Sequence, residues 1–367
     1  MMNILFAIKT IKKSKGGAER VLLDIANGLS KIHDVSLLTF DAEEGTPVYE
    51  IDEDLNVVYL GLGDAGKKAG YFETLTRIQL IRKYIKKRKP DVIIAFLHSM
   101  FVPMAIAKLG LNVPFIASEH IVPHHYSERR FEYMLMIFAG LLSNRITVLS
   151  EKIKNMYPRV LRGRMVAMPN LVIFPDKTLS HHDNKPDEGV ILNIGRLDPQ
   201  KDQICLINAF SLLASDFPGW QLRIIGEGAL LNDLKDLTKK KHLTERISFP
   251  GVVSNISSEY LSADIFAMSS SYESFGLVTA EAMAHGLPVV GFEDCPGTNE
   301  LIIHNENGLL VSGNYRVLAF SEGLRRLILS PSTRKGLGGG ASNSVKKYSK
   351  YKVLERWKVL IDEVVNS

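Results

Sequence analysis

Residues 189–216, GVILNIGRLDPQKDQICLINAFSLLASD, contain the pattern that decides the fold. Apolar residues dominate 189–194, as in a strand that is buried on both faces of a sheet. A polar turn that begins at a glycine follows, and the apolar residues of 203–216 then recur at helical spacing. A strand, a turn and a helix in this order form one unit of a parallel α/β sheet.

The same alternation of strand and helix extends through the chain in both directions. We expect strands at 3–8, 34–40, 91–97, 114–120, 145–150, 189–195, 220–226, 246–251, 264–269, 287–292 and 308–311. Helices are expected at 18–30, 77–89, 104–110, 131–142, 203–216, 229–242 and 351–365. The helix at 131–142 is expected in the core, and the glycine cluster at 336–341 is expected to form a loop.

The length indicates two domains. The chain has 367 residues, whereas a single domain usually has about 150–200. The stretch 171–189 is polar and rich in turn-forming residues, so we interpret it as a linker. We therefore expect a first domain at 1–172 and a second at 173–349, each a doubly wound α/β sheet.

The composition is that of a globular protein from a reducing compartment. Apolar residues make up 46% and charged residues 23%. The two cysteines, Cys205 and Cys295, provide neither a disulfide framework nor a metal knuckle. The first ten residues do not resemble a signal peptide, and no apolar run approaches the roughly 20 residues that span a bilayer. We expect a cytoplasmic protein.

The positive charge is concentrated in the first half. Residues 1–172 hold 24 Lys and Arg against 17 Asp and Glu, whereas residues 173–367 hold 21 against 23. The densest run, RIQLIRKYIKKRK at 77–89, has isoleucines at helical spacing between basic residues. It is either an ordinary surface helix or a helix that lies near an anionic membrane. Nucleic acid is disfavoured because the run has a single aromatic residue and no stacking platform.

Two loops follow strands and precede helices, where ligands of α/β sheets bind. Gly16 and Gly17 follow the first strand, and they form either a plain turn or a close approach to an anion. Arg196 and Lys201 follow the strand at 189–195. They are either exposed basic residues or a phosphate-binding pair, and their place before a helix favours phosphate.

The stretch YESFGLVTAE at 272–281 places two glutamates eight residues apart. They are either solvated acids on a helix or functional residues. On one continuous helix Glu273 and Glu281 would lie about 80° apart, so they do not form a single stripe. A loop glutamate followed by a helix that begins near Gly276 fits this spacing better.

Histidines cluster at 120–125, in HIVPHH. His120 and His124 have the spacing of two metal ligands on a helix, but Pro123 disfavours that helix and the zincin glutamate is missing. His120 follows a buried strand, which favours a polar role at the sheet edge. The nucleophile elbow G-x-S-x-G is absent, so a hydrolase of that type is disfavoured.

These residues carry a resemblance. The elements GGAER (16–20), SEH (118–120), GRLDPQK (195–201), YESFGLVTAE (272–281) and NGLLV (307–311) together resemble the retaining glycosyltransferases of family GT4. That family has the GT-B fold, in which two Rossmann-like domains face each other across a cleft. The resemblance implies that the last helix, at about 350–367, crosses back onto the first domain. The resemblance is strongest to bacterial enzymes that extend lipid-linked oligosaccharides or surface polysaccharides.

The resemblance implies roles in binding a nucleotide-sugar donor. Arg196 and Lys201 match the pair that holds the donor diphosphate. Glu281 matches the glutamate that binds the ribose, Glu273 the one that faces the donor sugar, and Val253 the position that meets the base.

Further positions match glycine-rich and helix-start elements of the family. Backbone groups of Gly276, Leu277 and Val278 would meet phosphate, and Gly16 and Gly17 would close over the donor.

His120 matches the histidine beside the reacting sugar, and with Glu273 it forms the expected catalytic pair. Phe275, Gly297 and Glu300 are expected near the sugar or phosphate. Two departures stand out. Asp202 follows Lys201 where the family often has glycine, and CPGTNE (295–300) replaces the usual G-G-x-x-E.

The implied activity is transfer of a hexose or N-acetylhexosamine, with retention of configuration, from a UDP-sugar to a polyprenyl-diphosphate-linked glycan. No metal and no other cofactor are expected, since fixed cations would stabilise the leaving diphosphate. The basic first domain would attach the enzyme to the inner face of the plasma membrane. A sugar-nucleotide epimerase of the same architecture and a non-catalytic nucleotide-sugar binder remain alternatives.

Overall fold

The computed structural model describes residues 1–12, 16–62, 70–175 and 187–367. The chain divides into two compact units, which we call the first and second domains. The first comprises Met1–Leu171 with Lys350–Ser367, and the second comprises Val172–Ser349. Each is built on one parallel sheet, so the predicted α/β fold with two Rossmann-like domains is confirmed. Most of the linker expected at 171–189 lies outside the described residues.

The sheet of the first domain has the strand order β3-β2-β1-β4-β5-β6-β7. Its strands are β1 (Asn3–Ala7), β2 (Asp34–Thr39), β3 (Asn56–Tyr59), β4 (Val92–Phe96), β5 (Phe115–Ser118), β6 (Arg145–Val148) and β7 (Met165–Ala167). Its helices are α1 (Gly17–Ser30), α2 (Tyr71–Arg88), α3 (His98–Ala107), α4 (Arg130–Leu141), α5 (Glu151–Met156), α6 (Arg159–Arg162) and α14 (Lys350–Val365), with a 3₁₀ turn, η1 (Pro123–Tyr126).

The central strands of this sheet were predictable and its edges were not. All five residues of β4 are buried, as expected for a strand covered on both faces. The edge strands β3 and β7 were missed by the sequence analysis. They are only four and three residues long, and β3 is half-exposed, so neither presents a long apolar run.

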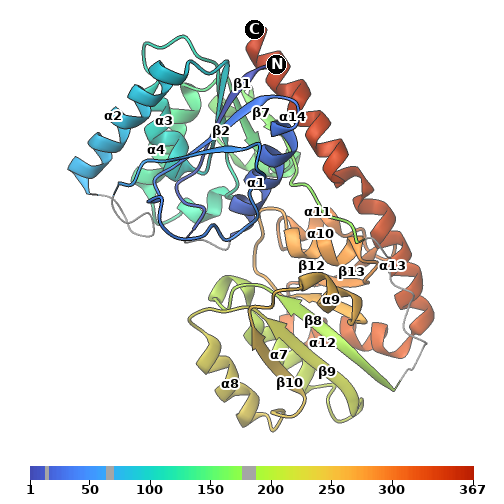
Figure 1. Ribbon diagram of the computed structural model, residues 1–367. Coiled ribbons are helices and arrows are strands. Elements are labelled where there is room, and N and C mark those ends of the chain that lie inside the picture. Colours follow the sequence, from blue (N-terminus) through green and yellow to red (C-terminus); the bar gives the residue numbers. More distant parts are fainter. Residues whose placement is uncertain (13–15, 63–69, 176–186) are drawn as a thin grey trace. The chain divides into compact units, whose positions relative to one another are not determined.

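Helix α14 completes the first domain, as the resemblance implied. It contacts α1 and β4 (Figure 1), although it follows the second domain in sequence. Its buried face consists of Val353, Trp357, Leu360, Ile361 and Val364. The ring of Trp357 stacks on Phe96 of β4 with centroids 6.1 Å apart.

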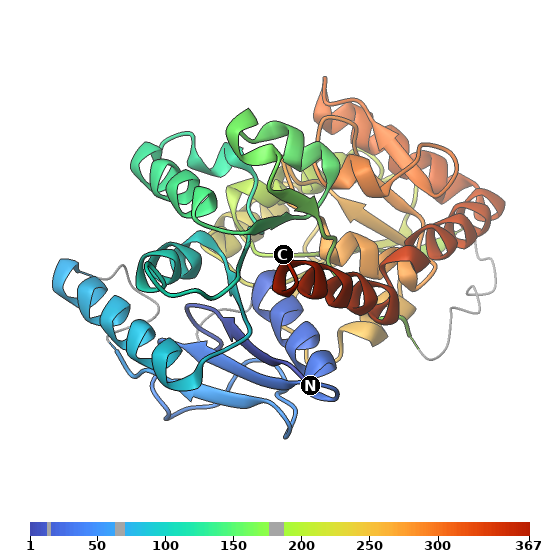
Figure 2. The same cartoon turned by 90° about the horizontal axis from the view of Figure 1, so that it is seen from above.

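Helices α2, α3 and α4 lie side by side along one face of this sheet, and α1 and α14 lie along the other (Figure 2). The expectation that α4 is a core helix is wrong for half of its surface. Its buried residues are Met136, Ala139 and Gly140, and a Cβ on Gly140 would lie only 2.9 Å from Ile146 of β6. Other large apolar residues of α4 point outward, and Phe131 and Met134 are 68% and 60% exposed.

The sheet of the second domain has the strand order β10-β9-β8-β11-β12-β13. Its strands are β8 (Glu188–Ile194), β9 (Gly219–Ile225), β10 (Ile247–Gly251), β11 (Ile265–Met268), β12 (Val289–Phe292) and β13 (Gly308–Val311). Its helices are α7 (Gln203–Ser211), α8 (Leu231–Lys240), α9 (Ile256–Leu261), α10 (Leu277–Ala284), α11 (Thr298–Leu301), α12 (Arg316–Leu329) and α13 (Pro331–Val345), with 3₁₀ turns η2 (Pro199–Lys201) and η3 (Lys346–Tyr348).

The glycine cluster at 336–341 is helical, which corrects the expected loop. It lies inside α13, which packs on α10 and β13. Gly340 faces a neighbouring backbone, since a Cβ there would lie 2.1 Å from the carbonyl oxygen of Glu306. Tertiary contact at so short a distance requires glycine and overrides its low helix propensity.

Two neighbouring glycines of α13 should therefore respond oppositely to alanine. Gly340→Ala forces the backbone near Glu306 to move and should destabilise the protein by about 1–3 kcal/mol. A Cβ at position 339 would have no neighbouring atom within 4 Å. Gly339→Ala should therefore stabilise the protein by about 0.5–1 kcal/mol, because alanine has the higher helix propensity. Chemical denaturation of both variants measures these changes. Equal stability of the two variants would contradict the close packing of α13.

Candidate active site

Most of the expected donor-site residues lie at one edge of the second sheet. Strand β8 stands between β9 and β11. Strands β9 and β10 are added on one side of it and β11 to β13 on the other, so the strand order reverses at β8. The loops after β8 and β11 therefore diverge from this switch point, where ligands of open α/β sheets bind. Arg196 and Lys201 follow β8, and Glu273 follows β11.

The loop after β8 orients its two basic residues differently. The Arg196 side chain is 71% exposed, and its Nη2 lies 3.0 Å from Asp198. The carbonyl of Arg196 accepts a hydrogen bond of 2.9 Å from Gln203, which ties the loop to α7. Asp198 caps the following 3₁₀ turn by accepting from the Lys201 backbone N–H. Arg196 thus extends into solvent, whereas Lys201 turns inward.

Lys201 and Glu273 form a largely buried ion pair. Lys201 Nζ lies 2.5 Å from Glu273 Oε1, and Ser270 donates to the same oxygen at 2.6 Å. The two loops are also joined through Gln200, whose Nε2 donates to the Tyr272 carbonyl at 2.9 Å. The two charged residues were expected at this site from the sequence, whereas Ser270 and Gln200 were not.

Helix α10 begins beside this pair, as the sequence analysis predicted. Gly276 is its N-cap residue and has φ +78°, which glycine adopts without strain. Leu277 and Val278 open the helix, whose first backbone N–H groups have no partner inside the helix. A helix start of this kind attracts anions. The side chain of Phe275 instead packs edge-on against Tyr348.

Glu281 is held inside the second domain by a tyrosine. Tyr260 of α9 donates to Glu281 Oε2 at 3.1 Å and to the Val278 carbonyl at 3.2 Å. The ring of His285 packs against Tyr260, and its Nδ1 lies 2.7 Å from the Glu281 carbonyl oxygen. Nothing near Glu281 in the sequence indicated Tyr260, which lies 21 residues earlier.

The loop after β12 approaches Glu273 closely. The Glu273 N–H donates to the Pro296 carbonyl at 3.0 Å, and a Cβ on Gly297 would lie 2.6 Å from the Glu273 carbonyl oxygen. Gly297 also has φ +78°. Glu300 is half-buried in the short helix that follows. Val253 follows β10, which β9 separates from β8, so it lies farther along the sheet edge.

The first domain carries the other expected residues at its own strand ends. Gly16 is the N-cap of α1 and Gly17 is its first residue, and Tyr49 donates to the Gly16 carbonyl. His120 follows β5, where its Nε2 lies 3.0 Å from Ser118 Oγ and its ring stacks on Phe96. Burial lowers the pKa of His120 to about 3, so the imidazole is neutral at physiological pH.

Glu119, next to His120, forms a buried network that the sequence analysis missed. Its Oε1 accepts from the Ile121 N–H at 3.0 Å, and its Oε2 accepts from Tyr126 at 2.8 Å. The Tyr126 hydroxyl also lies 2.9 Å from His98 Nδ1. Burial raises the pKa of Glu119 to about 7 and lowers that of His98 to about 4. Burial thus favours the uncharged forms of the two groups that hold the segment after β5.

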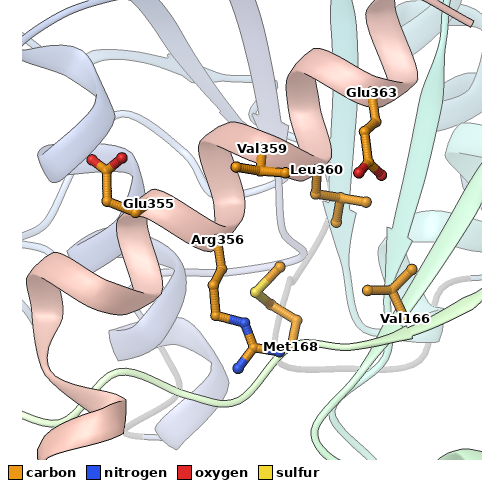
Figure 3. Close-up of a pocket in the computed structure, with 7 residues that line it drawn as sticks. All are labelled: Val166, Met168, Glu355, Arg356, Val359, Leu360 and Glu363. Atoms are coloured by element: carbon orange, nitrogen blue, oxygen red, sulfur yellow. The ribbon is translucent and has the colours of Figure 1, made fainter.

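The first domain also has two pockets away from these residues. A groove of about 310 Å³ runs between α14 and the edge strand β7, lined by Val166, Met168, Glu355, Arg356, Val359, Leu360 and Glu363 (Figure 3). A cavity of about 590 Å³ lies near the amino ends of β4, β5 and β6. None of the expected site residues lines either pocket.

The described part of the chain has neither a metal-binding cluster nor a membrane-spanning helix. Across residues 1–12, 16–62, 70–175 and 187–367, no three His, Cys, Asp or Glu side chains are grouped to hold a metal ion. Within the same ranges, no helix has the length and apolar character needed to cross a bilayer.

Comparisons with known proteins agree with this architecture. Residues 15–172 match the family model "Glycosyltransferase Family 4", and residues 176–343 match "Glycosyl transferases group 1". An uncharacterized glycosyltransferase of Haemophilus influenzae is 28% identical and covers 98% of this chain and 100% of its own. A Campylobacter jejuni N-acetylgalactosaminyltransferase acting on an undecaprenol-diphosphate glycan is 28% identical over the whole of both chains.

Solved structures share the fold. Sucrose-phosphate synthase of Thermosynechococcus elongatus matches with a TM-score of 0.85 at 18% identity, covering 99% of each chain. HepE of Anabaena, solved with UDP and glucose, matches with a TM-score of 0.75 at 19% identity, covering 99% of this chain and 100% of its own.

The buried Glu119 should make stability depend on pH in a defined direction. Its pKa is about 7 in the folded chain and 4.5 for the unperturbed group, so the folded state holds an extra proton between these values. Its contribution is fully present below pH 4.5 and is lost as pH rises through 7, by about 1.4 kcal/mol per unit.

Glu119→Gln removes this titration, and its amide oxygen can accept from the Ile121 N–H while its amide NH2 donates to the Tyr126 oxygen. Its melting temperature should therefore rise relative to that of the wild type between pH 5 and pH 8. Glu151→Gln, at a largely exposed position, is the control and should follow the wild-type curve. Parallel curves for Glu119→Gln and the wild type would show that Glu119 is not protonated in the folded state.

Proposed function

Because the chain belongs to the glycosyltransferases with the two-domain GT-B fold, we propose that it moves a hexose or N-acetylhexosamine from a UDP-sugar to a lipid-linked oligosaccharide. The named relatives support this choice. One acts on an undecaprenol-diphosphate glycan and another belongs to amylovoran biosynthesis in Erwinia amylovora. The UDP in the HepE structure favours a uridine nucleotide. The proposed product is a bacterial polysaccharide or glycan.

The observation that carries this proposal is the meeting of Lys201, Glu273 and the start of α10 at the switch point of the second sheet. A diphosphate is the ligand class that a buried lysine and a helix start together attract. Arg196, exposed on the same loop, can add a bidentate contact to a phosphate group.

The proposed mechanism stabilises the leaving group. Negative charge gathers on the nucleoside diphosphate as the glycosidic bond breaks, and fixed cations in a desolvated site stabilise it. Arg196, Lys201 and the α10 backbone would do this without a metal ion or other cofactor. We propose that the acceptor hydroxyl attacks on the face that the nucleotide leaves, which retains the anomeric configuration.

The remaining residues take the roles that the family resemblance implies. Glu281, already oriented by Tyr260, would accept hydrogen bonds from the ribose hydroxyls. Glu273 would bind a hydroxyl of the donor sugar, and Val253 would meet the base. His120, which is neutral at physiological pH, would hydrogen-bond the reacting sugar.

Lys201→Ala and Glu281→Ala should weaken UDP binding by about 10- to 100-fold each, since a hydrogen bond to a charged group contributes about 1.5–3 kcal/mol. Isothermal titration calorimetry measures this change. Lys239→Ala is the control, because Lys239 is 70% exposed on α8 of the same domain. If both site variants bind UDP as tightly as the wild type, the donor site lies elsewhere.

We further propose that the first domain attaches the enzyme to an anionic membrane. Helix α2 buries Ile81 and Ile85, while Lys83, Lys86 and Lys87 are exposed. Each exposed basic residue near such a surface contributes about 1 kcal/mol of attraction. The three arginines of the run are engaged within the protein: Arg77 pairs with Glu73, Arg88 with Asp34, and Arg82 donates to the carbonyl groups of 107 and 109.

The outward stripe of α4 supports the same proposal. It consists of Phe131, Met134, Phe138 and Leu141, all at least 40% exposed. These residues recur at helical spacing, and α4 lies in the same helix layer as α2 (Figure 2). An exposed apolar stripe near basic residues is typical of a helix that lies in the interface of a bilayer.

Replacing Lys83, Lys86 and Lys87 with Glu should release the protein from vesicles that contain phosphatidylglycerol, because it reverses three charges at the proposed contact. Vesicle flotation measures the bound fraction. Replacing Lys239, Lys240 and Lys241 with Glu changes the net charge equally at exposed positions of the second domain and should leave flotation unchanged. Equal flotation of the two triple variants would remove α2 from the membrane contact.

A further inference from the structure

Asp202 occupies a backbone position that suits glycine. It has φ +48° and ψ +44°, the left-handed region in which a side chain is strained. It directly follows Lys201, where the family resemblance implies a glycine. The loop keeps the conformation of a glycine although the residue is an aspartate, so other contacts must hold it there.

Two contacts hold the Asp202 side chain. Its Oδ1 accepts from the Cys205 N–H at 3.2 Å, which caps α7. Its Oδ2 lies 3.4 Å from Nε of Arg316, the first residue of α12. The aspartate at this position therefore gains a helix cap and an ion pair that a glycine could not make.

Arg316 is itself fixed from three further sides. Its Nη2 donates to the carbonyl of Ser269 at 3.1 Å, and its guanidinium lies 3.5 Å from the ring centroid of Phe292. Its Nη1 lies 3.3 Å from Asp294 Oδ1. The guanidinium thus spans the ends of β11 and β12 and the start of α7.

These contacts lead directly to the Lys201–Glu273 pair. Ser269, whose carbonyl Arg316 holds, donates through its own hydroxyl to the Lys201 carbonyl at 2.8 Å. The next residue, Ser270, donates to Glu273 Oε1. Arg316 therefore reaches both chain segments that carry the pair through their neighbours, Asp202 on one side and Ser269 on the other.

We propose that Arg316 and Asp202 act together in place of a glycine at this position, and that Arg316 is a positioning residue for the donor diphosphate. Arg316 holds Asp202 in the left-handed conformation and neutralises its charge, which would otherwise repel phosphate beside Lys201. This inference rests on the proposed donor site.

A double-mutant cycle separates this role from a general structural one. Arg316→Gln should raise the Kd for UDP about tenfold in the wild-type background. In the Asp202→Gly background, glycine adopts the conformation unaided and leaves no charge to neutralise. There, Arg316→Gln should change the Kd less than about threefold. Asp202→Gly alone should bind UDP nearly as well as the wild type.

Uridine provides a second readout, because it lacks the diphosphate. Arg316→Gln should leave uridine affinity unchanged while it weakens UDP, which a general loss of folding would not do. Arg325→Gln is the matched control. Arg325 lies on the same helix, pairs with Asp216 at 2.7 Å and covers the ring of Phe217. It should leave both affinities unchanged.

The outcomes distinguish this inference from the proposed function. Unchanged UDP binding in Lys201→Ala and Glu281→Ala refutes the donor site itself. If those variants lose affinity while Arg316→Gln does not, the donor site stands and the role of Arg316 is refuted. If Arg316→Gln costs the same affinity in the wild-type background and in the Asp202→Gly background, the joint action of the two residues is refuted.

Discussion

The ion pair of Lys201 and Glu273 is the interaction on which the second domain's site depends. Removing two charges from water costs more than their attraction returns unless hydrogen bonds complete the site. Ser270 supplies one such bond to Glu273. Apolar residues of similar size would often give the folded state equal stability, so a buried ion pair is weak evidence of a stabilising role. Its value lies in holding a lysine, already desolvated, next to the start of α10. At the proposed donor site, a diphosphate would then meet a positive charge whose position needs little rearrangement.

The sequence predicted the fold where burial dictates the residue pattern. Strands covered on both faces, such as β4, must be apolar along their length, and every such strand of the two sheets was expected. The prediction failed where tertiary contact outweighs local preference. The edge strands β3 and β7 are too short and too exposed to show a pattern. Helix α13 contains four glycines at 336–340 and is nevertheless helical, because Gly340 lies against the backbone of Glu306.

The candidate site divides in the same way. The residues that we propose to meet the donor, such as Lys201 and Gly276, stand in short motifs that a single sequence displays. The residues that hold them come from distant elements. Tyr260 lies 21 residues before Glu281, and Arg316 lies more than 100 residues after Asp202. Nothing local marks a supporting residue, because its neighbours in sequence belong to an ordinary helix. The sequence showed that Asp202 stands where the family resemblance implies a glycine. The pairing of Asp202 with Arg316 became visible only when α12 was placed beside the loop.

The two domains differ in the charge they present at their strand ends. In the second domain, Arg196, Lys201 and the start of α10 present positive charge or polarity, which suits a diphosphate. In the first domain, burial shifts the pKa of an acid upward and those of two histidines downward. Glu119 reaches about 7, whereas His98 and His120 fall to about 4 and 3. All three shifts favour the uncharged form. His98 and His120 are therefore neutral at physiological pH, and Glu119 is about half protonated near pH 7. Burial thus lowers the charge at the strand ends of the first domain, whereas the second domain keeps Arg196 and Lys201 at its strand ends.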